Sequence, residues 1–380
     1  MKKKLTLIAL TLGLGFYATE SSAKLFTLRV TDYGTLDDGT PDPLEASLIN
    51  YINQQVQEVE DKVNDDIPLP PQDRFMEGMA NSSVMAGKGI GKDYASNMSV
   101  VLIGAGIGVA ADLEKDEVTD SPFSGIGVAP GLVVGANLGF LPTPKLLGME
   151  TKRLNMYFNF MKYNLDRDIS TEAGKESSAS LDLFSIGTHF RYDWIKPRGT
   201  KLLGWGGVKL HFGYEYNSMD ISYLGKISQT LDETDTTNNR IQGVARAAPT
   251  MQIESATHSI PLEISTDVQL LYFLSLYTGV GADANFGEAS SKGNLNSDEM
   301  TITCTNSTAA SACGSLGGGT RTVRAQADAD IEGKGSVNPF LFRGFAGVQI
   351  NLPYVRIFGQ VDKSLGDDLI AGTAGVRFVY

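Results

Sequence analysis

Residues suited to metal binding or catalysis are scarce in this chain. Its 380 residues include three histidines and two cysteines. There is no C-x-x-C pair and no histidine stands two residues after an aspartate, so we expect no metal, no cofactor and no enzymatic activity. Acidic residues outnumber basic ones by 44 to 32, without any basic stripe, and this balance argues against a nucleic-acid partner.

The sequence also lacks a stretch that could cross a membrane as a helix. The apolar run from Leu5 to Phe16 is shorter than the roughly 20 residues that a bilayer-spanning helix needs. It follows three lysines and precedes Ser21-Ser22-Ala23, an order typical of a secretory signal peptide. Residues 1–23 are therefore expected to be a signal peptide, and the rest of the chain is expected to be exported.

The two cysteines, Cys304 and Cys313, stand close together in a polar segment. An even number of cysteines in an exported chain favours pairing between them. The sequence thus predicts one disulfide in a loop.

Alternation with a period of two is the main pattern from residue 98 onward. Val101, Ile103 and Ile107, for example, alternate with glycines. Such alternation predicts strands whose two faces meet different environments. The segments expected to be strands are 101–109, 126–138, 154–160, 184–194, 208–216, 250–266, 274–284, 340–350, 355–362 and 370–380.

The lengths of these strands and of their linkers point to a membrane protein. Many of the strands are long enough for a tilted membrane crossing, and short proline-marked turns alternate with long polar loops. We therefore expect an all-β fold, an antiparallel transmembrane β-barrel over residues 98–380. Ten strands are expected, and twelve are the alternative, because residues 219–227 and 323–331 also have strand character.

The last predicted strand ends in a specific pattern. Val376, Phe378 and Tyr380 share one face, and the final residue is aromatic. This stretch resembles the C-terminal signal of bacterial outer-membrane β-barrel proteins, which the barrel-assembly machinery reads. The resemblance implies a location in the bacterial outer membrane, with its lipid and the assembly machinery as partners. It identifies no subfamily.

Residues 24–97 are expected to be a partly helical N-terminal extension. Between residues 44 and 63 apolar side chains recur on one helical face, and a weaker helical pattern covers 72–85. Three interpretations stay open: packing on another surface of the protein, a plug inside the barrel, or a periplasmic arm. The inward positions of the first two strands are almost all glycine, which often marks the close approach of another backbone. The hypothesis is that the helix of 44–63, or the segment after it, enters the barrel.

Charged and polar residues occupy inward positions of the later strands. Each needs a partner or water, because an unpaired buried charge is costly. The residues expected to face the lumen, as a channel lining, are Arg153, His189, Arg191, Asp193, Lys209, His211, Glu215, Arg343, Arg356, Asp362 and Arg377.

The predicted function is a small porin-like channel that passes polar solutes. The alternative is a structural or adhesin-like surface barrel that meets an extracellular partner through its long outer loops. The sequence names neither a solute nor a partner, and it does not give the oligomeric state.

Overall fold

The computed structural model describes residues 27–32, 72–95, 100–113, 124–168, 178–200, 202–225, 227–234, 239–297, 300–306 and 321–380. The predicted signal peptide, the predicted helix at 44–63 and Cys313 lie outside these ranges, so the disulfide stays a prediction. In the described part of the chain, no helix is long and apolar enough to span a membrane.

The described strands close into a ring. Each strand pairs in antiparallel fashion with its neighbours, and the ring closes where the last strand pairs with the first. The ten ring strands are β2 (Val101–Asp112), β3 (Gly125–Asn137), β6 (Leu154–Asp168), β7 (Ser178–Ile195), β9 (Leu203–Leu224), β11 (Asn239–Leu270), β12 (Leu274–Ser297), β15 (Phe340–Leu352), β16 (Val355–Ser364) and β17 (Leu369–Val379). The predicted antiparallel barrel of ten strands is confirmed.

Alternation sorts the side chains of each strand between the two faces. On β17, Val376 and Phe378 are 39% and 59% exposed, whereas Thr373 and Arg377 are each 3% exposed. Apolar side chains therefore point outward and polar ones inward, the reverse of a soluble sandwich and the arrangement that lipid requires. Pro261 does not end its strand: β11 runs through it without a change of register.

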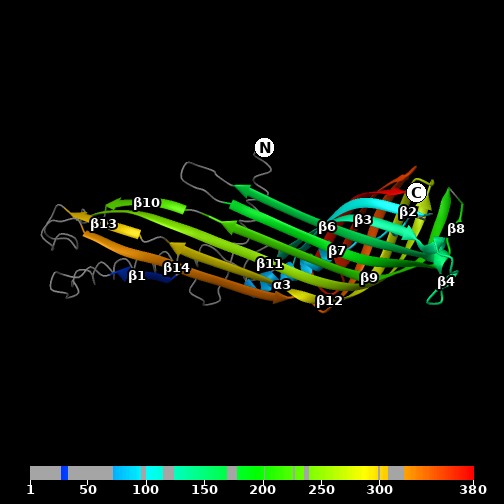
Figure 1. Ribbon diagram of the computed structural model, residues 1–380, viewed down its shortest axis with the longest axis horizontal. Coiled ribbons are helices and arrows are strands. Elements are labelled where there is room, and N and C mark those ends of the chain that lie inside the picture. Colours follow the sequence, from blue (N-terminus) through cyan, green and yellow to red (C-terminus); the bar gives the residue numbers. More distant parts are fainter. Residues whose placement is uncertain are drawn as a thin grey trace.

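Several strands extend far beyond the ring. β10 (Ile227–Thr234) continues β9 along β11, and β14 (Arg321–Ser336) continues β15 along β12, each in unbroken register. β13 (Met300–Asn306) and β1 (Thr27–Asp32) complete this extension. We call it the projecting sheet: β1, β10, β13 and β14 with the outer parts of β6, β7, β9, β11 and β12 (Figure 1). The segments behind the twelve-strand alternative are thus continuations of existing strands.

An aromatic row on the outward face marks one limit of the membrane. Its rings lie 4.6 to 5.9 Å apart, centroid to centroid, across five neighbouring strands. The row consists of Phe160, Phe184, Tyr216, His258 and Phe286. Aromatic rings of this kind are typical of the membrane–water interface. From His258 to the turn after Leu270, β11 rises about 30 Å at roughly 3.3 Å per residue and a tilt of roughly 40°, which is the depth of a bilayer core.

The two ends of the barrel differ. The short turns, the C-terminus and the small elements η2 (Leu138–Phe140), β4 (Lys145–Leu146), β5 (Met149–Glu150), η3 (Thr151–Arg153) and β8 (Arg198–Gly199) lie at one end. The projecting sheet leaves the other end (Figure 1). Short turns face the periplasm in such barrels, so the projecting sheet lies outside the cell. The helix α3 (Gln72–Ala86) confirms the weaker helical pattern at 72–85 and packs against the inner face of β2, β3, β12 and β14.

Trimming the projecting sheet tests whether the membrane part folds by itself. Leu224 and Thr250 are directly paired, so residues 225–249 can be replaced by an Asn-Gly turn without moving either strand. We expect the trimmed chain to fold, because the ring below the aromatic row keeps its ladder. Heat-modifiable migration and far-UV circular dichroism in detergent measure this. A chain that migrates as unfolded before heating would contradict it.

Candidate functional site

The wall of β2 and β3 is flat enough for a helix backbone to lie directly on it. A Cβ atom on Gly127 would collide with the carbonyl oxygen of Ser82, and one on Gly108 would collide with that of Ala86. Both residues belong to α3, and Ala86 is its last residue. The close backbone approach that the glycines predicted is therefore made by α3, within the segment that follows residues 44–63.

Two lysines that follow α3 reach into a group of buried carboxylates. Lys88 Nζ lies 2.8 Å from Glu215 Oε2 and donates to Ser259 Oγ at 2.7 Å. Lys92 Nζ lies 2.8 Å from Glu215 Oε1 and 2.6 Å from Glu263 Oε1. Both ammonium groups are buried, so their charges are neutralised by the barrel wall rather than by solvent.

Arg343 holds the opposite side of the same group. Its guanidinium bonds to Asp283 Oδ2 at 2.9 Å, to Asp362 Oδ1 at 2.5 Å and to Glu263. Side chains of all four residues are fully buried. We call Lys88, Lys92, Glu215, Glu263, Asp283, Arg343 and Asp362 the lumen charge network. We call residues 72–94, which carry α3 and both lysines, the plug segment. Because the charges of the network come from the plug segment and from five strands, the network ties that segment across the whole lumen.

Below the network, the backbone of the same segment is held by cations of the wall. Arg191 Nη1 donates to the carbonyl of Asp93 at 2.7 Å, and Lys209 Nζ donates to that of Tyr94 at 2.6 Å. Lys209 also pairs with Asp267. The chain from Gln72 to Tyr94 thus runs through the lumen and is bonded at both levels.

The other predicted lumen residues divide into two sets. Arg377 donates to backbone carbonyls of the plug segment, His211 Nε2 lies 3.0 Å from Ser265 Oγ, and His189 lies beside Glu215. Arg153 and Arg356 instead lie at the periplasmic rim. Arg153 bonds to the carbonyl of Asp193, and Arg356 bonds to the carbonyl of Val355 at 3.2 Å, so both hold the backbone at strand ends.

Several members of the network were not singled out from the sequence. Lys88 and Lys92 stand four residues apart in a glycine-rich stretch, and this spacing was the available signal for a pair on one side of a chain. Glu263 and Asp283 share the inward parity of their strands. Their pairing with the plug depends on contacts across more than 170 residues, which periodicity does not report.

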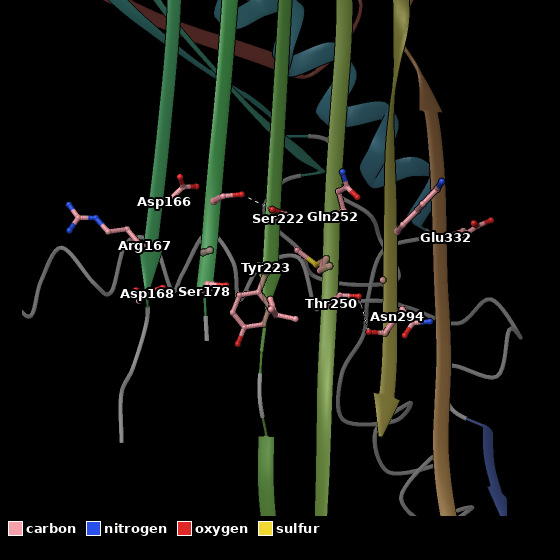
Figure 2. Close-up of a pocket in the computed structure, with 16 residues that line it drawn as sticks. Asp166, Arg167, Asp168, Ser178, Ser222, Tyr223, Thr250, Gln252, Asn294 and Glu332 are labelled. Carbon is pink, nitrogen blue, oxygen red and sulfur yellow. Dashed lines mark hydrogen bonds between the residues drawn. The ribbon is translucent and has the colours of Figure 1, made fainter. Parts of the chain in front are cut away.

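The outer half of the lumen is apolar instead. Met76, Met79 and Val84 of α3 pack with Leu183 and Met219 of the wall. Beyond the N-terminal end of α3, a cavity of about 1060 Å³ opens at the mouth, lined by β6, β7, β9, β11, β12 and β14 (Figure 2). The labelled residues that line it include Asp166, Arg167, Ser222, Tyr223, Gln252 and Glu332. The lumen therefore has a charged periplasmic part, an apolar middle and an open outer mouth. No group of three or more potential metal ligands is present among the described residues.

The closed ring, its lipid-facing apolar surface and its polar filled interior define an integral β-barrel protein of the bacterial outer membrane. More specifically, the chain belongs to the Lsa36-like family, whose model matches residues 26–380. No curated protein matches it.

Solved structures similar to this chain include three outer-membrane proteins. The transport unit of the autotransporter AIDA-I from Escherichia coli has 10% identity, with 82% of this chain and 99% of that chain covered and a TM-score of 0.31. The translocator domain of the autotransporter NalP from Neisseria meningitidis has 10% identity, coverage of 75% and 90%, and a TM-score of 0.28. The attachment invasion locus protein Ail of Yersinia pestis has 12% identity, coverage of 74% and 100%, and a TM-score of 0.18.

Addition of a single methyl group tests the glycine wall, by which we mean the inner face of β2 and β3 on which α3 lies. In Gly127→Ala the new Cβ meets the helix backbone at Ser82, so α3 must shift and we expect a loss of about 1–3 kcal/mol. The control is Gly372→Ala, where nothing lies within 4 Å of the added Cβ. Thermal unfolding in detergent measures both, and equal midpoints would contradict the predicted packing.

Removal of one cation tests the lumen charge network. Arg343→Ala leaves three buried carboxylates without their shared partner, and we expect a loss of about 3–5 kcal/mol. The matched control is Lys334→Ala, which breaks the exposed pair with Glu288 and is expected to cost at most about 1 kcal/mol. Urea unfolding followed by tryptophan fluorescence compares the two variants. A loss for Arg343→Ala no larger than the control would mean that the network does not hold the lumen together.

Proposed function

We propose that this protein is a closed surface barrel whose working part is the projecting sheet, and that it does not form a standing pore for solutes. Of the two functions that the sequence leaves open, this is the structural or adhesin-like one. The porin-like function would require the plug segment to leave the lumen.

The filled lumen carries the proposal. Residues from Gln72 to Tyr94 occupy it, and Lys88, Lys92 and Arg343 are each at most 1% exposed. A solute path through this level would have to separate two lysines from Glu215 and Glu263. Breaking one side of a buried ion pair costs about 3–5 kcal/mol, so several such breaks would leave few open molecules at equilibrium.

The length of the outer strands supports the second half of the proposal. The 32 residues of β11 exceed the roughly 9–11 that a transmembrane strand needs. The part of β11 before His258 lies beyond the aromatic row, together with the outer parts of its neighbours. A long ordered sheet at this place is useful for contact with molecules outside the cell, whereas solute passage does not need it.

Planar-bilayer recordings test the closed barrel. We expect no steady conductance from the complete mature chain and steady openings after deletion of residues 24–97, which removes the plug segment. Deletion of residues 33–66 is the control, because it keeps β1 and α3 and is expected to stay closed. Steady openings from the complete chain would support the porin-like function instead.

A protease treatment of intact cells tests the projecting sheet. We expect cleavage between residues 225 and 249 while the rest of the chain stays intact, because that segment lies outside the membrane. The trimmed chain, which lacks residues 225–249, is the control and should resist. Cleavage that requires permeabilised cells would place the sheet on the wrong side for a surface function.

A further inference from the structure

The strands β3 and β6 are paired with each other over only part of their length. Their ladder reaches the pair Leu132–Phe160 and stops there. Both strands continue outward from this point, β3 as far as Gly125 and β6 as far as Asp168. β6 stays paired with β7 over this whole outer part. Beyond Phe160, β6 therefore has a partner on one side only among the described strands.

A proline on β3 explains where the ladder stops. The N–H of Asn137 donates to the carbonyl of Val100, just before β2, at 3.0 Å, so odd-numbered residues of β3 bond toward β2 and even-numbered ones face β6. Pro130 is even-numbered and has no N–H to donate to β6. Farther out, the N–H of Ile126 donates to Met79 Sδ of α3 at 3.4 Å instead. The open edge of β3 is thus bonded to the plug segment.

The facing edge of β6 has no such cover among the described residues. Even-numbered residues of β6 face β3 in the ladder, and the register of β6 on β7 is unbroken to its end. The N–H and C=O groups that point away from β7 are therefore those of Lys162, Asn164, Asp166 and Asp168. All four residues are exposed. Figure 2 shows β6 as the last strand of the sheet beside Asp166 and Asp168.

This free edge lies on the outer side of the membrane. Phe160 belongs to the aromatic row, and residues 161–168 follow it with four charged side chains, as expected for a strand in water. No proline and no bulge interrupts these eight residues. Proteins commonly use both devices to block an exposed strand edge, and without them the edge is a template for a further strand. Such a strand would come from outside the cell.

The side chains along the edge define the chemistry of the strand that fits. Asp166 and Asp168 share one face of β6, whereas Tyr163 and Leu165 share the other. Directly opposite residues of an antiparallel pair attract when their charges are opposite and repel when they are alike. The fitting strand therefore has basic residues opposite the two aspartates and apolar residues opposite Leu165 and Tyr163.

We propose that residues 161–168 bind an extended segment of an extracellular protein as an added antiparallel strand, with basic residues of that segment opposite Asp166 and Asp168. This inference rests on the surface function proposed above and names its kind of partner. Backbone hydrogen bonds along the edge supply the affinity, and the two carboxylates select the sequence. A second copy in the same membrane does not fit, because both copies of β6 run outward and cannot pair in antiparallel fashion.

Binding of a designed peptide tests this assignment. Placed antiparallel to β6, the peptide Lys-Glu-Lys-Val-Thr-Val-Glu sets its lysines opposite Asp168 and Asp166 and its valines opposite Leu165 and Tyr163. Its fluorescence anisotropy is followed with the complete mature chain in detergent, and we expect saturable binding below about 1 mM. N-methylation of the third and fifth residues removes the N–H groups that face β6 and should weaken binding at least about tenfold. N-methylation of the fourth and sixth residues, whose N–H groups point away, is the matched control and should leave the affinity unchanged.

A change in the edge itself complements the peptide series. Asn164→Pro removes one N–H of the free edge without affecting the ladder to β7, and we expect at least about tenfold weaker binding. Asn164→Ala keeps that N–H and should bind as the unchanged chain does. Heat-modifiable migration checks folding. If Asn164→Pro does not fold, the double variant Asp166→Lys, Asp168→Lys replaces it, and this variant should prefer a peptide whose two lysines are replaced by glutamate.

Absence of peptide binding, or equal binding of the two N-methylated peptides, would overturn the proposal. A dimer that forms with rising protein concentration and is lost in Asn164→Pro would also overturn it, by assigning the edge to a second copy of the chain. The surface function itself is judged separately, by the conductance and protease measurements described above, so the two failures are distinguishable.

Discussion

The constraint on which the structure depends is that every charge inside this barrel must find its partner inside the barrel. The outward face of each strand meets lipid, so the inward face must accept whatever polar residues remain. Water could satisfy them in a wide barrel, but a ring of ten strands leaves a narrow interior. Here, Lys88 and Lys92 of the N-terminal segment meet Glu215 and Glu263 of the wall. The plug segment is therefore part of the folded barrel.

The plug segment also fills the space beside the inward glycines of β2 and β3. Gly108 and Gly127 lack side chains that could fill the space inside their strands, and the backbone of α3 occupies it directly. This contact between two backbones leaves no room for a Cβ atom on the glycine side. The glycine wall and the helix are consequently complementary, and a change in one is felt by the other.

The chemical character of the lumen changes along the barrel axis. The lumen is charged near the periplasm, apolar where Met79 meets Met219, and open at the mouth. The aromatic row shows that the apolar part and the mouth lie at or beyond the outer limit of the lipid. The barrel thus continues outside the membrane as a curved, partly covered sheet. This continuation distinguishes the protein from a barrel that ends in loops at the membrane surface.

Local pattern predicted much of the fold. Alternation within each strand identified all ten ring strands, because lipid and lumen impose opposite polarity on consecutive residues. The run at 323–331 was ambiguous, because alternation does not tell whether the glycine-marked break at 333–335 is a turn that adds strands or a bulge within one hairpin. The register of β14 and β15 on the same neighbour, β12, resolves it.

The sequence by itself determined which faces of the strands are apolar, where the strands run and that glycines line part of the interior, since each of these is a property of neighbouring residues. Only the tertiary structure decided that Arg343 binds three carboxylates, that Lys88 and Lys92 are their counterparts, and that Arg153 and Arg356 hold strand ends at the rim. These pairings join residues that are far apart in the chain. Their partners are chosen by the closure of the ring and the position of α3, which no local periodicity records.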